Sequence, residues 1–291
     1  MGNAEYWVQL DNDRIQCRLC PHACVLEPDQ LGSCLARKNE HGKMSLPFYA
    51  QISSIALDPV EKKPLRRFLP HTKTFSVGFW HCNMHCPFCQ NWEIAHPSKN
   101  APERYSQTIL PETLVDMAVR SGCPSISFTY SEPTLHIEYV KESMRLAHGH
   151  GLATILVTNG NLLEPPAKDI LSLTDATNVD LKCFSTTTYH ELLGGELKVV
   201  QNFIRIAASL CHVEVTSLLV PGVLDNAVDM EGIAGFLASI SRSLPLHITA
   251  YRPEFQWMLA PLTSEKMKEI ARPAFEKLDY VYLSQPLPID F

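Results

Sequence analysis

Short β-rich runs alternate with amphipathic or polar segments over most of this chain, and this alternation constrains its fold more than any other feature. The runs that favour strands cover residues 75–79, 125–129, 154–158, 178–181, 213–220 and 246–251, with a seventh at 280–283. Segments that favour helices lie between them, at residues 111–121, 134–148, 166–173, 198–210, 228–241 and 264–277. This order is typical of parallel strands joined by crossover helices. We therefore predict an α/β fold, a full or partial (β/α) barrel of about six parallel strands.

The first 70 residues differ from the rest of the chain, because they hold four cysteines and few periodic stretches. We expect residues 1–70 to form a Cys-rich N-terminal extension, packed on one barrel domain of residues 71–291. The Pro-rich end of the chain, SQPLPIDF, is expected to trail over the surface. Hydrophobic residues make up 45% of the chain and charged residues 19%, which excludes an intrinsically disordered protein.

The charge balance limits the partners of this protein. It has 25 Lys and Arg against 31 Asp and Glu, a net charge of −6, which argues against a nucleic acid as its partner. No stretch reaches the roughly 18 apolar residues of a membrane helix, and the first residues lack the apolar core of a signal peptide. We expect a cytoplasmic protein without a membrane span. One basic stretch is expected to form a solvated face: Lys62, Lys63, Arg66 and Arg67.

Three of the ten cysteines lie in one loop, WHCNMHCPFCQNW, directly after the first predicted strand. Without a secretory signal, cysteines are expected to act as reduced ligands or catalysts. Cys82, Cys86 and Cys89 can hold a cubane iron–sulfur cluster and leave its fourth iron free for a small molecule. A zinc site with His81 or His85 as the fourth ligand is the alternative for this loop.

A second group of cysteines lies near the N-terminus and consists of Cys17, Cys20, Cys24 and Cys34. Four thiolates can close a structural zinc site or hold a second iron–sulfur cluster, and zinc is favoured because the set is complete. Cys123 and Cys211 are expected to be small buried hydrophobic residues. Cys183 follows a predicted strand end, where a thiol could donate a hydrogen atom, although packing is the favoured interpretation.

The loop at Cys82 resembles the Cys-x3-Cys-x2-Cys signature of the radical S-adenosylmethionine (SAM) superfamily, including the aromatic residue before the third cysteine. The resemblance implies a [4Fe-4S] cluster held by Cys82, Cys86 and Cys89, SAM at the open iron, and Phe88 against the adenine. It also implies a full or partial (β/α) barrel with this loop after the first strand, where the strand prediction independently places it.

The end of the second predicted strand carries a further match. Thr129-Tyr130-Ser131-Glu132-Pro133 resembles the family's Gly-Gly-Glu-Pro segment, whose backbone and acid hold the SAM amino group. Glu132 matches the acid, whereas Tyr130 and Ser131 replace the two glycines. The alternative is that Glu132 and Pro133 merely start a helix.

Two later strand ends match as well, in the order that the family requires. Thr158-Asn159-Gly160 resembles the segment that approaches the SAM ribose, with Asn159 nearest, and otherwise is an ordinary turn. Asp180-Leu181-Lys182 resembles the Asp-x-Lys of glycyl-radical-enzyme activators, which lies near the SAM carboxylate, and otherwise is a surface ion pair. Strand ends are where barrel enzymes hold their sites.

The resemblance spans nearly the whole chain. The early cysteines and the segments DPVEKKPL and FTYSEP are most similar to the radical SAM enzyme of the AmmeMemoRadiSam system, itself similar to pyruvate formate-lyase activating enzymes. The resemblance implies an oxidoreductase that cleaves SAM to methionine and a 5′-deoxyadenosyl radical, with the loop cysteines and Lys182 serving catalysis. It further implies flavodoxin or ferredoxin as electron donor and a protein glycine as substrate.

Other functions stay open at this point. The radical could modify another protein, an RNA or a small molecule instead of a protein glycine. The chain could also be a non-catalytic metal-binding scaffold with zinc at both cysteine groups, or an electron-transfer protein that binds no SAM.

Overall fold

An eight-stranded sheet forms the centre of the computed structural model, which describes residues 3–284. In spatial order its strands are β7 (Ser54–Pro59), β8 (Lys73–Gly78), β10 (Ser125–Thr129), β11 (Ala153–Thr158), β12 (Ala176–Asp180), β13 (His212–Leu219), β14 (Leu246–Ala250) and β15 (Val281–Leu283). Neighbours from β8 to β15 pair in parallel, and β7 pairs antiparallel with β8. The predicted α/β fold is confirmed, with seven parallel strands and an antiparallel edge strand that was not predicted. All but the first residue of SQPLPIDF lie outside the described residues.

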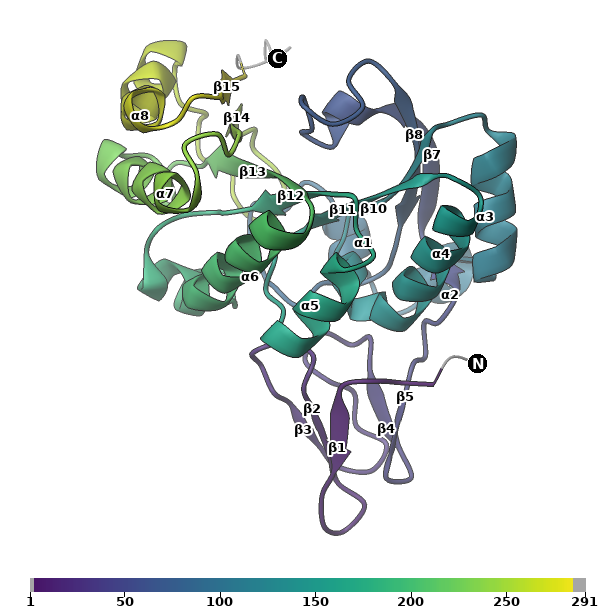
Figure 1. Ribbon diagram of the computed structural model, residues 1–291. Coiled ribbons are helices and arrows are strands. Elements are labelled where there is room, and N and C mark those ends of the chain that lie inside the picture. Colours follow the sequence, from purple (N-terminus) through teal and green to yellow (C-terminus); the bar gives the residue numbers. More distant parts are fainter. Residues whose placement is uncertain (1–2, 285–291) are drawn as a thin grey trace.

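Helices connect the parallel strands and follow one another along one side of the sheet (Figure 1). They are α3 (Pro111–Arg120), α4 (Ile137–Gly149) after a 3₁₀ turn η2 (Pro133–His136), α5 (Glu164–Leu171), α6 (Leu197–Leu210) after a π-helical turn η3 (Thr188–Leu192), α7 (Ala227–Ile240) and α8 (Ser264–Lys277). The starts of two helices are fixed locally. The side chains of Asn226 and Thr263 accept hydrogen bonds from the first-turn N–H groups of α7 and α8, as helix-capping residues do.

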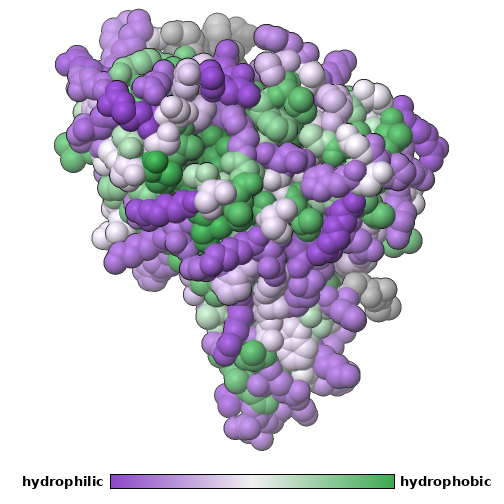
Figure 2. All heavy atoms as spheres, viewed as in Figure 1, coloured by the Kyte–Doolittle hydropathy of each residue, from purple (hydrophilic) through white to green (hydrophobic). Residues whose placement is uncertain are grey.

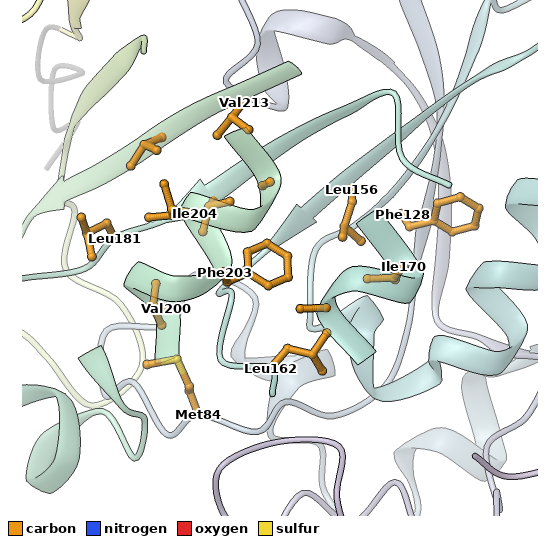
Figure 3. Close-up of a cluster of buried hydrophobic side chains, with 14 of the residues drawn as sticks. Met84, Phe128, Leu156, Leu162, Ile170, Leu181, Val200, Phe203, Ile204 and Val213 are labelled. Atoms are coloured by element: carbon orange, nitrogen blue, oxygen red, sulfur yellow. The ribbon is translucent and has the colours of Figure 1, made fainter. Parts of the chain in front are cut away.

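The main hydrophobic core lies between these helices and the sheet. Leu156 of β11, Ile170 of α5 and Phe203 of α6 are fully buried there and point toward one another (Figure 3). Full burial of a side chain of this size stabilises the fold by roughly 1.5–3 kcal/mol. This packing holds each strand end, and hence each site residue that follows it, in a defined position.

The segment 60–68, which begins with the 3₁₀ turn η1 (Val60–Lys62), packs on the opposite face of the sheet at β11 and β12. Its Val60 and Leu65 pack on Ile155 and Ala176, whose side chains leave the strands on the side away from Leu156. Lys63 is only 2% exposed, so the prediction of a solvated basic face is wrong for this residue. The sequence pattern concealed this burial because the partners of the segment lie on distant strands.

Glu214 of β13 anchors the same segment. Its carboxylate accepts hydrogen bonds from the backbone N–H groups of Arg66 and Arg67, at 2.8–3.0 Å, and lies 2.5 Å from Nε2 of His247. Burial disfavours the charged form of Glu214, but His212, His247 and the two backbone N–H groups outweigh burial and lower its pKa to about 2.

Short strands at the N-terminus form a small lobe at one end of the molecule (Figure 1). It contains β1 (Trp7–Gln9), β2 (Ile15–Cys17), β3 (Val25–Leu26), β4 (Lys38–Glu40) and β5 (Lys43–Ser45). The remaining elements are β6 (Gln51–Ile52) paired with β9 (Gln107–Thr108), α1 (Trp92–Ala95) and α2 (Ala101–Tyr105). Because β7 lies in the main sheet, part of the first 70 residues belongs to the barrel-like core. The domain boundary at residue 70 stays a prediction.

The surface is mixed in character. Figure 2 shows hydrophilic residues along the outer edge of one face and hydrophobic residues gathered nearer its middle. Among residues 3–284, no helix has the length and apolar character needed to cross a bilayer.

Candidate active site

A cavity of about 570 Å³ opens at the carboxyl ends of the parallel strands, a size typical of ligand sites. Every residue predicted for the cluster and SAM site lines it, namely Cys82, Cys86, Phe88, Cys89, Tyr130, Ser131, Glu132, Thr158, Asn159, Asp180 and Lys182. These residues come from four different strand ends, and the parallel pairing of the sheet brings those ends to one edge. The residues predicted for the site thus line one cavity, and their individual roles stay predictions.

The three loop cysteines lie between β8 and α1. Cys86 is buried, whereas Cys82 and Cys89 are half-buried. Backbone hydrogen bonds hold the loop along its length: His81 N–H to Ile94 O, His85 N–H to Leu193 O, and Gln256 N–H to Pro87 O. The three sulfurs are thus presented to the cavity by a loop that is fixed on both sides.

The environment of these sulfurs suits a thiolate-bound cation. Burial raises the pKa of Cys86 to about 11 and raises that of Cys82 well above its ordinary value. A bound metal would reverse this effect, because its charge stabilises the thiolates. Cys82 Sγ already accepts hydrogen bonds from the Met84 N–H at 3.4 Å and from Asn159 Nδ2 at 3.5 Å. The donor set therefore fits an iron–sulfur cluster.

The zinc alternative for this loop depends on His81 or His85. His81 is buried against the ring of Phe48, with ring centroids 4.7 Å apart, and His85 packs on Gly194. Within the part of the chain that the structure describes, neither histidine lines the cavity with the cysteines. The geometry thus gives no support to His81 or His85 as a fourth ligand.

Glu132 is the most firmly held residue of the cavity. Its Oε1 accepts hydrogen bonds from the hydroxyls of Thr134 and Thr158, both at 2.7 Å, and from the Thr134 N–H at 3.1 Å. Its Oε2 accepts one from the Asn159 N–H at 2.8 Å. Burial raises the pKa of Glu132, and these donors oppose the rise. One carboxylate thus joins the ends of β10 and β11.

Asn159 connects Glu132 to the cysteine loop. Its Nδ2 donates to Asn83 Oδ1 at 2.9 Å as well as toward Cys82. The next residue, Gly160, has φ +67° and packs so closely that an added Cβ would lie 3.0 Å from Val179. Glycine is therefore required at this turn.

Asp180 and Lys182 form an ion pair of 2.9 Å after β12. Burial disfavours the ammonium of Lys182, but Asp180 and Cys86 outweigh burial and hold its pKa well above the ordinary value. Lys182 is only 17% exposed, whereas Asp180 is 39% exposed, so the pair is partly shielded from solvent. A positive charge thus stands beside the cysteine loop.

Sequence reasoning missed Lys63, which lines the cavity, and Asp58, which pairs with it. Lys63 Nζ lies 2.7 Å from Asp58 Oδ2 and 4.2 Å from the ring centroid of Tyr130, and the Tyr130 hydroxyl also donates to Asp58. Burial disfavours the Asp58 carboxylate, but Lys63, Tyr130 and Lys62 outweigh it and hold its pKa below the ordinary value. Asp58 and Lys63 both lie in DPVEKKPL, one of the segments on which the family resemblance was based. That resemblance was the available signal that this segment belongs near the site.

Tyr130 occupies a strained position that glycine fills in the resembling segment. Its φ is +75°, a left-handed conformation that a bulky residue rarely adopts. The ring lies against Gly78, where an added Cβ would be 2.9 Å from Tyr130. Ser131, by contrast, is held simply, since its hydroxyl donates to the Phe79 carbonyl at 2.8 Å.

The isolated cysteines lie outside this cavity. Cys183 is fully buried and its thiol faces the Ser185 carbonyl at 3.7 Å, in agreement with the packing interpretation. Cys123 is buried as expected, whereas Cys211 is half-buried.

The N-terminal cysteines lie in the lobe, where Cys17, Cys20 and Cys34 are buried and Cys24 is half-buried. Across residues 3–284, no three His, Cys, Asp or Glu side chains are gathered at metal-binding distance. This applies to the loop cysteines and the N-terminal cysteines alike.

Comparison with known proteins identifies the family. The model of the Radical SAM superfamily matches residues 81–237, more than half of the chain. The chain belongs to the radical SAM superfamily. Radical SAM enzymes use a [4Fe-4S] cluster and SAM, so membership implies both groups for this protein.

Individual relatives agree with this membership. An uncharacterized protein of Methanocaldococcus jannaschii is 34% identical over 288 residues, which cover 97% of this chain and 85% of that protein. Among solved structures, Streptococcus suis SuiB bound to S-adenosylmethionine has a TM-score of 0.56 at 11% identity, covering 73% of this radical SAM chain and 51% of SuiB. The structure of TYW1 with a lysine-pyruvate adduct has a TM-score of 0.54 at 15% identity, covering 78% and 84% of the two chains. At these identities the two structures show a shared fold.

Proposed function

We propose that this radical SAM enzyme binds SAM in the cavity at the strand ends and abstracts a hydrogen atom from a substrate that enters there. The observation behind the proposal is that three cysteine sulfurs, the Glu132 carboxylate and the Lys182 ammonium all line one cavity. Convergence of metal-binding thiols with groups of opposite charge suits a zwitterionic ligand held against a cluster.

Cys82, Cys86 and Cys89 would hold the [4Fe-4S] cluster. When bound and reduced, the cluster supplies the electron that splits SAM into methionine and a 5′-deoxyadenosyl radical. The chain's own contribution is to orient SAM and to exclude water. The N–H donors at Cys82, from Met84 and Asn159, would fix the sulfur and tune its electronics.

The remaining roles follow from charge and from free hydrogen-bonding capacity. Glu132 Oε2 accepts one hydrogen bond among the described residues, so it keeps a lone pair for the SAM ammonium. Lys182 would bind the SAM carboxylate, with Asp180 holding the lysine in place. Phe88 would pack on the adenine, and Asn159 would lie near the ribose.

The substrate is the finer part of the proposal. The Asp180-x-Lys182 arrangement supports a glycyl-radical-enzyme activator, with flavodoxin or ferredoxin as electron donor in the cytoplasm. Modification of another protein, an RNA or a small molecule is the competing function. Lys62 and Arg252 also line the cavity, and within the described residues Arg252 has no ion-pair partner, which favours an anionic group on the substrate. The relation to the AmmeMemoRadiSam enzyme stays a prediction.

The test is to purify the protein without oxygen, reconstitute it with iron and sulfide, reduce it, add SAM, and quantify 5′-deoxyadenosine and methionine. We expect both products, and we expect Cys86→Ala to lose the cluster absorbance and both products together. Cys211→Ala is the matched control and should keep all three signals. Cleavage that persists in Cys86→Ala would contradict the ligand assignment, and bound zinc without cleavage would favour the scaffold function.

A second assay addresses the glycine. After the SAM reaction with a candidate glycyl-radical enzyme, electron paramagnetic resonance should detect a carbon-centred radical on that partner. SAM cleavage without this signal, across the available partners, would favour the competing substrates while leaving the radical SAM chemistry intact.

A further inference from the structure

The N-terminal lobe brings its four cysteines close to one another. Strands β2 and β3 pair antiparallel through Ile15 with Leu26 and Gln16 with Val25. The ladder continues for one step, because the Cys17 N–H donates to the Cys24 carbonyl at 2.9 Å. Cys17 and Cys24 are therefore cross-strand neighbours although six residues separate them in the chain.

The third and fourth cysteines reach the same place through turns. A Cβ built on Gly32 would lie 3.8 Å from Cys34 Sγ and 4.0 Å from Cys24 Sγ, so both sulfurs border one point. Gly32 itself is fixed by its N–H bond to the Arg37 carbonyl at 2.8 Å. The Cys20 thiol is close enough to Cys17 and Cys34 to interact with both electrostatically.

The backbone around three of these sulfurs is arranged for thiolates. The N–H groups of Leu19, His22 and Ala36 approach the sulfurs of Cys17, Cys20 and Cys34, in each case from two residues further along the chain. In the cluster loop the Met84 N–H donates to Cys82 Sγ from the same relative position. Such N–H donors orient metal-bound thiolates and are shared by the two groups of cysteines.

A buried cation accompanies the sulfurs. Arg37 is 1% exposed, interacts electrostatically with Cys17 and Cys34, and pairs with Glu138 of α4 at 2.6 Å. Its Nε–H has no hydrogen-bond partner among the described residues. An unpaired buried donor beside thiols is costly unless a charged acceptor forms there. A thiolate would be that acceptor.

We propose that Cys17, Cys20, Cys24 and Cys34 bind one zinc ion as a closed structural site. The four thiols lose four protons and the metal brings two positive charges, leaving a net charge of −2 next to Arg37. Four protein thiolates complete a tetrahedral shell, and in the described structure none of them lines the SAM cavity, as expected for a structural metal. Binding requires the sulfurs to turn inward to about 2.3 Å from the ion.

The zinc site would stabilise the position of the cluster loop. The Asn83 side chain lies close to the Cys20 thiol, and Asn83 Oδ1 accepts from Asn159, which also donates to Cys82. The Leu163 N–H donates to the Leu19 carbonyl at 3.0 Å, which ties the lobe to the chain after β11. Polar contacts thus run from the N-terminal cysteines to the first cluster ligand.

The experiment is metal analysis of the full-length chain, and it does not depend on SAM cleavage. The triple variant Cys82→Ala, Cys86→Ala, Cys89→Ala should retain about one zinc per chain. Adding Cys20→Ser and Cys34→Ser to it should abolish zinc binding, whereas adding Cys211→Ser should not. Three results would each overturn the proposal. They are iron and sulfide in the triple variant in place of zinc, the absence of metal from the triple variant, and zinc that persists after loss of Cys20 and Cys34.

A measurement on the triple variant alone covers the case in which the serine variants fail to fold. Cobalt(II) exchanged into its zinc site should give the intense visible bands of tetrahedral tetrathiolate coordination. A thiol-binding mercurial should then release the metal as four thiols are titrated. Weak octahedral bands, or release by fewer than three thiols, would contradict a four-cysteine site.

Discussion

Replacing Glu132 by glutamine tests the centre of the site. Glu132 Oε1 accepts the Thr134 N–H and Oε2 accepts the Asn159 N–H. Glutamine has one carbonyl oxygen, so in either orientation its amide NH₂ group faces one of these two backbone donors. Hydroxyl groups can rotate to adapt, but a backbone N–H cannot.

The cost follows from this geometry. A buried donor left without an acceptor costs about 1–3 kcal/mol, so Glu132→Gln should lower the free energy of unfolding by that amount. The variant also loses the negative charge proposed to bind the SAM ammonium. A hydrogen bond to a charged group contributes about 1.5–3 kcal/mol, which corresponds to a roughly 10- to 150-fold weaker Kd for SAM.

Two measurements separate these effects. Urea denaturation of the reduced, metal-free protein reports stability, and equilibrium SAM binding to the reconstituted protein reports affinity. Glu164→Gln, the same change at an exposed helix start, is the control: it loses an exposed pair with Lys168, so stability should change much less than in Glu132→Gln and SAM affinity should not change. Wild-type stability in Glu132→Gln would refute the argument from the two N–H groups, and wild-type SAM affinity would refute the binding role.

Three further predictions concern charge and packing. Lys182→Met should weaken SAM binding at least about tenfold while iron content stays unchanged, because the ammonium beside Asp180 is lost; unchanged affinity would exclude its contact with SAM. Glu214→Gln should reduce the free energy of unfolding by about 3 kcal/mol at pH 7, since the fold lowers the pKa of this carboxyl from 4.5 to about 2. The carboxylate stabilises the fold above pH 4.5, and this contribution is lost as the pH falls toward 2. The stabilities of wild type and variant, measured by denaturation, should therefore converge between pH 4.5 and 2. A stability difference that stays constant over this interval would contradict the argument. Gly78→Ala should destabilise the fold by about 1–3 kcal/mol, because its Cβ would lie 2.2 Å from Ser54 Oγ, whereas Gly149→Ala, with open space around it, should be tolerated; equal thermal shifts would contradict this.

Local patterns in the sequence were sufficient to predict most of the sheet and its helices. The predicted strand 125–129 and helix 264–277 have the bounds of β10 and α8, because hydrophobic periodicity and capping act within a few residues. The antiparallel strand β7 escaped prediction. Its partners on β8 lie beyond a turn and the segment 60–68, so its pairing depends on contacts that no local pattern records.

The candidate site likewise has features that local sequence predicts and features that depend on contacts between distant residues. The spacing of the loop cysteines and the position of each motif after a strand were enough to bring Glu132, Asn159 and Lys182 to one edge, because parallel strands end on the same side of a sheet. The zinc alternative with a histidine ligand could not be decided from spacing alone. It required knowing that His81 packs on Phe48 and His85 on Gly194, so that neither lines the cavity.

The succession of strands along the chain, the family signature and the residues that follow each strand can be read from the sequence, since each depends on residues close together in the chain. Packing of the folded chain was needed to show that Lys63 is buried against Asp58 and Tyr130, and that the Cys20 thiol lies near Asn83 of the cluster loop. Asp58 and Tyr130 are 72 residues apart in the chain. A contact of that kind forms when packing of the whole sheet brings two distant segments together, and no short-range pattern encodes it.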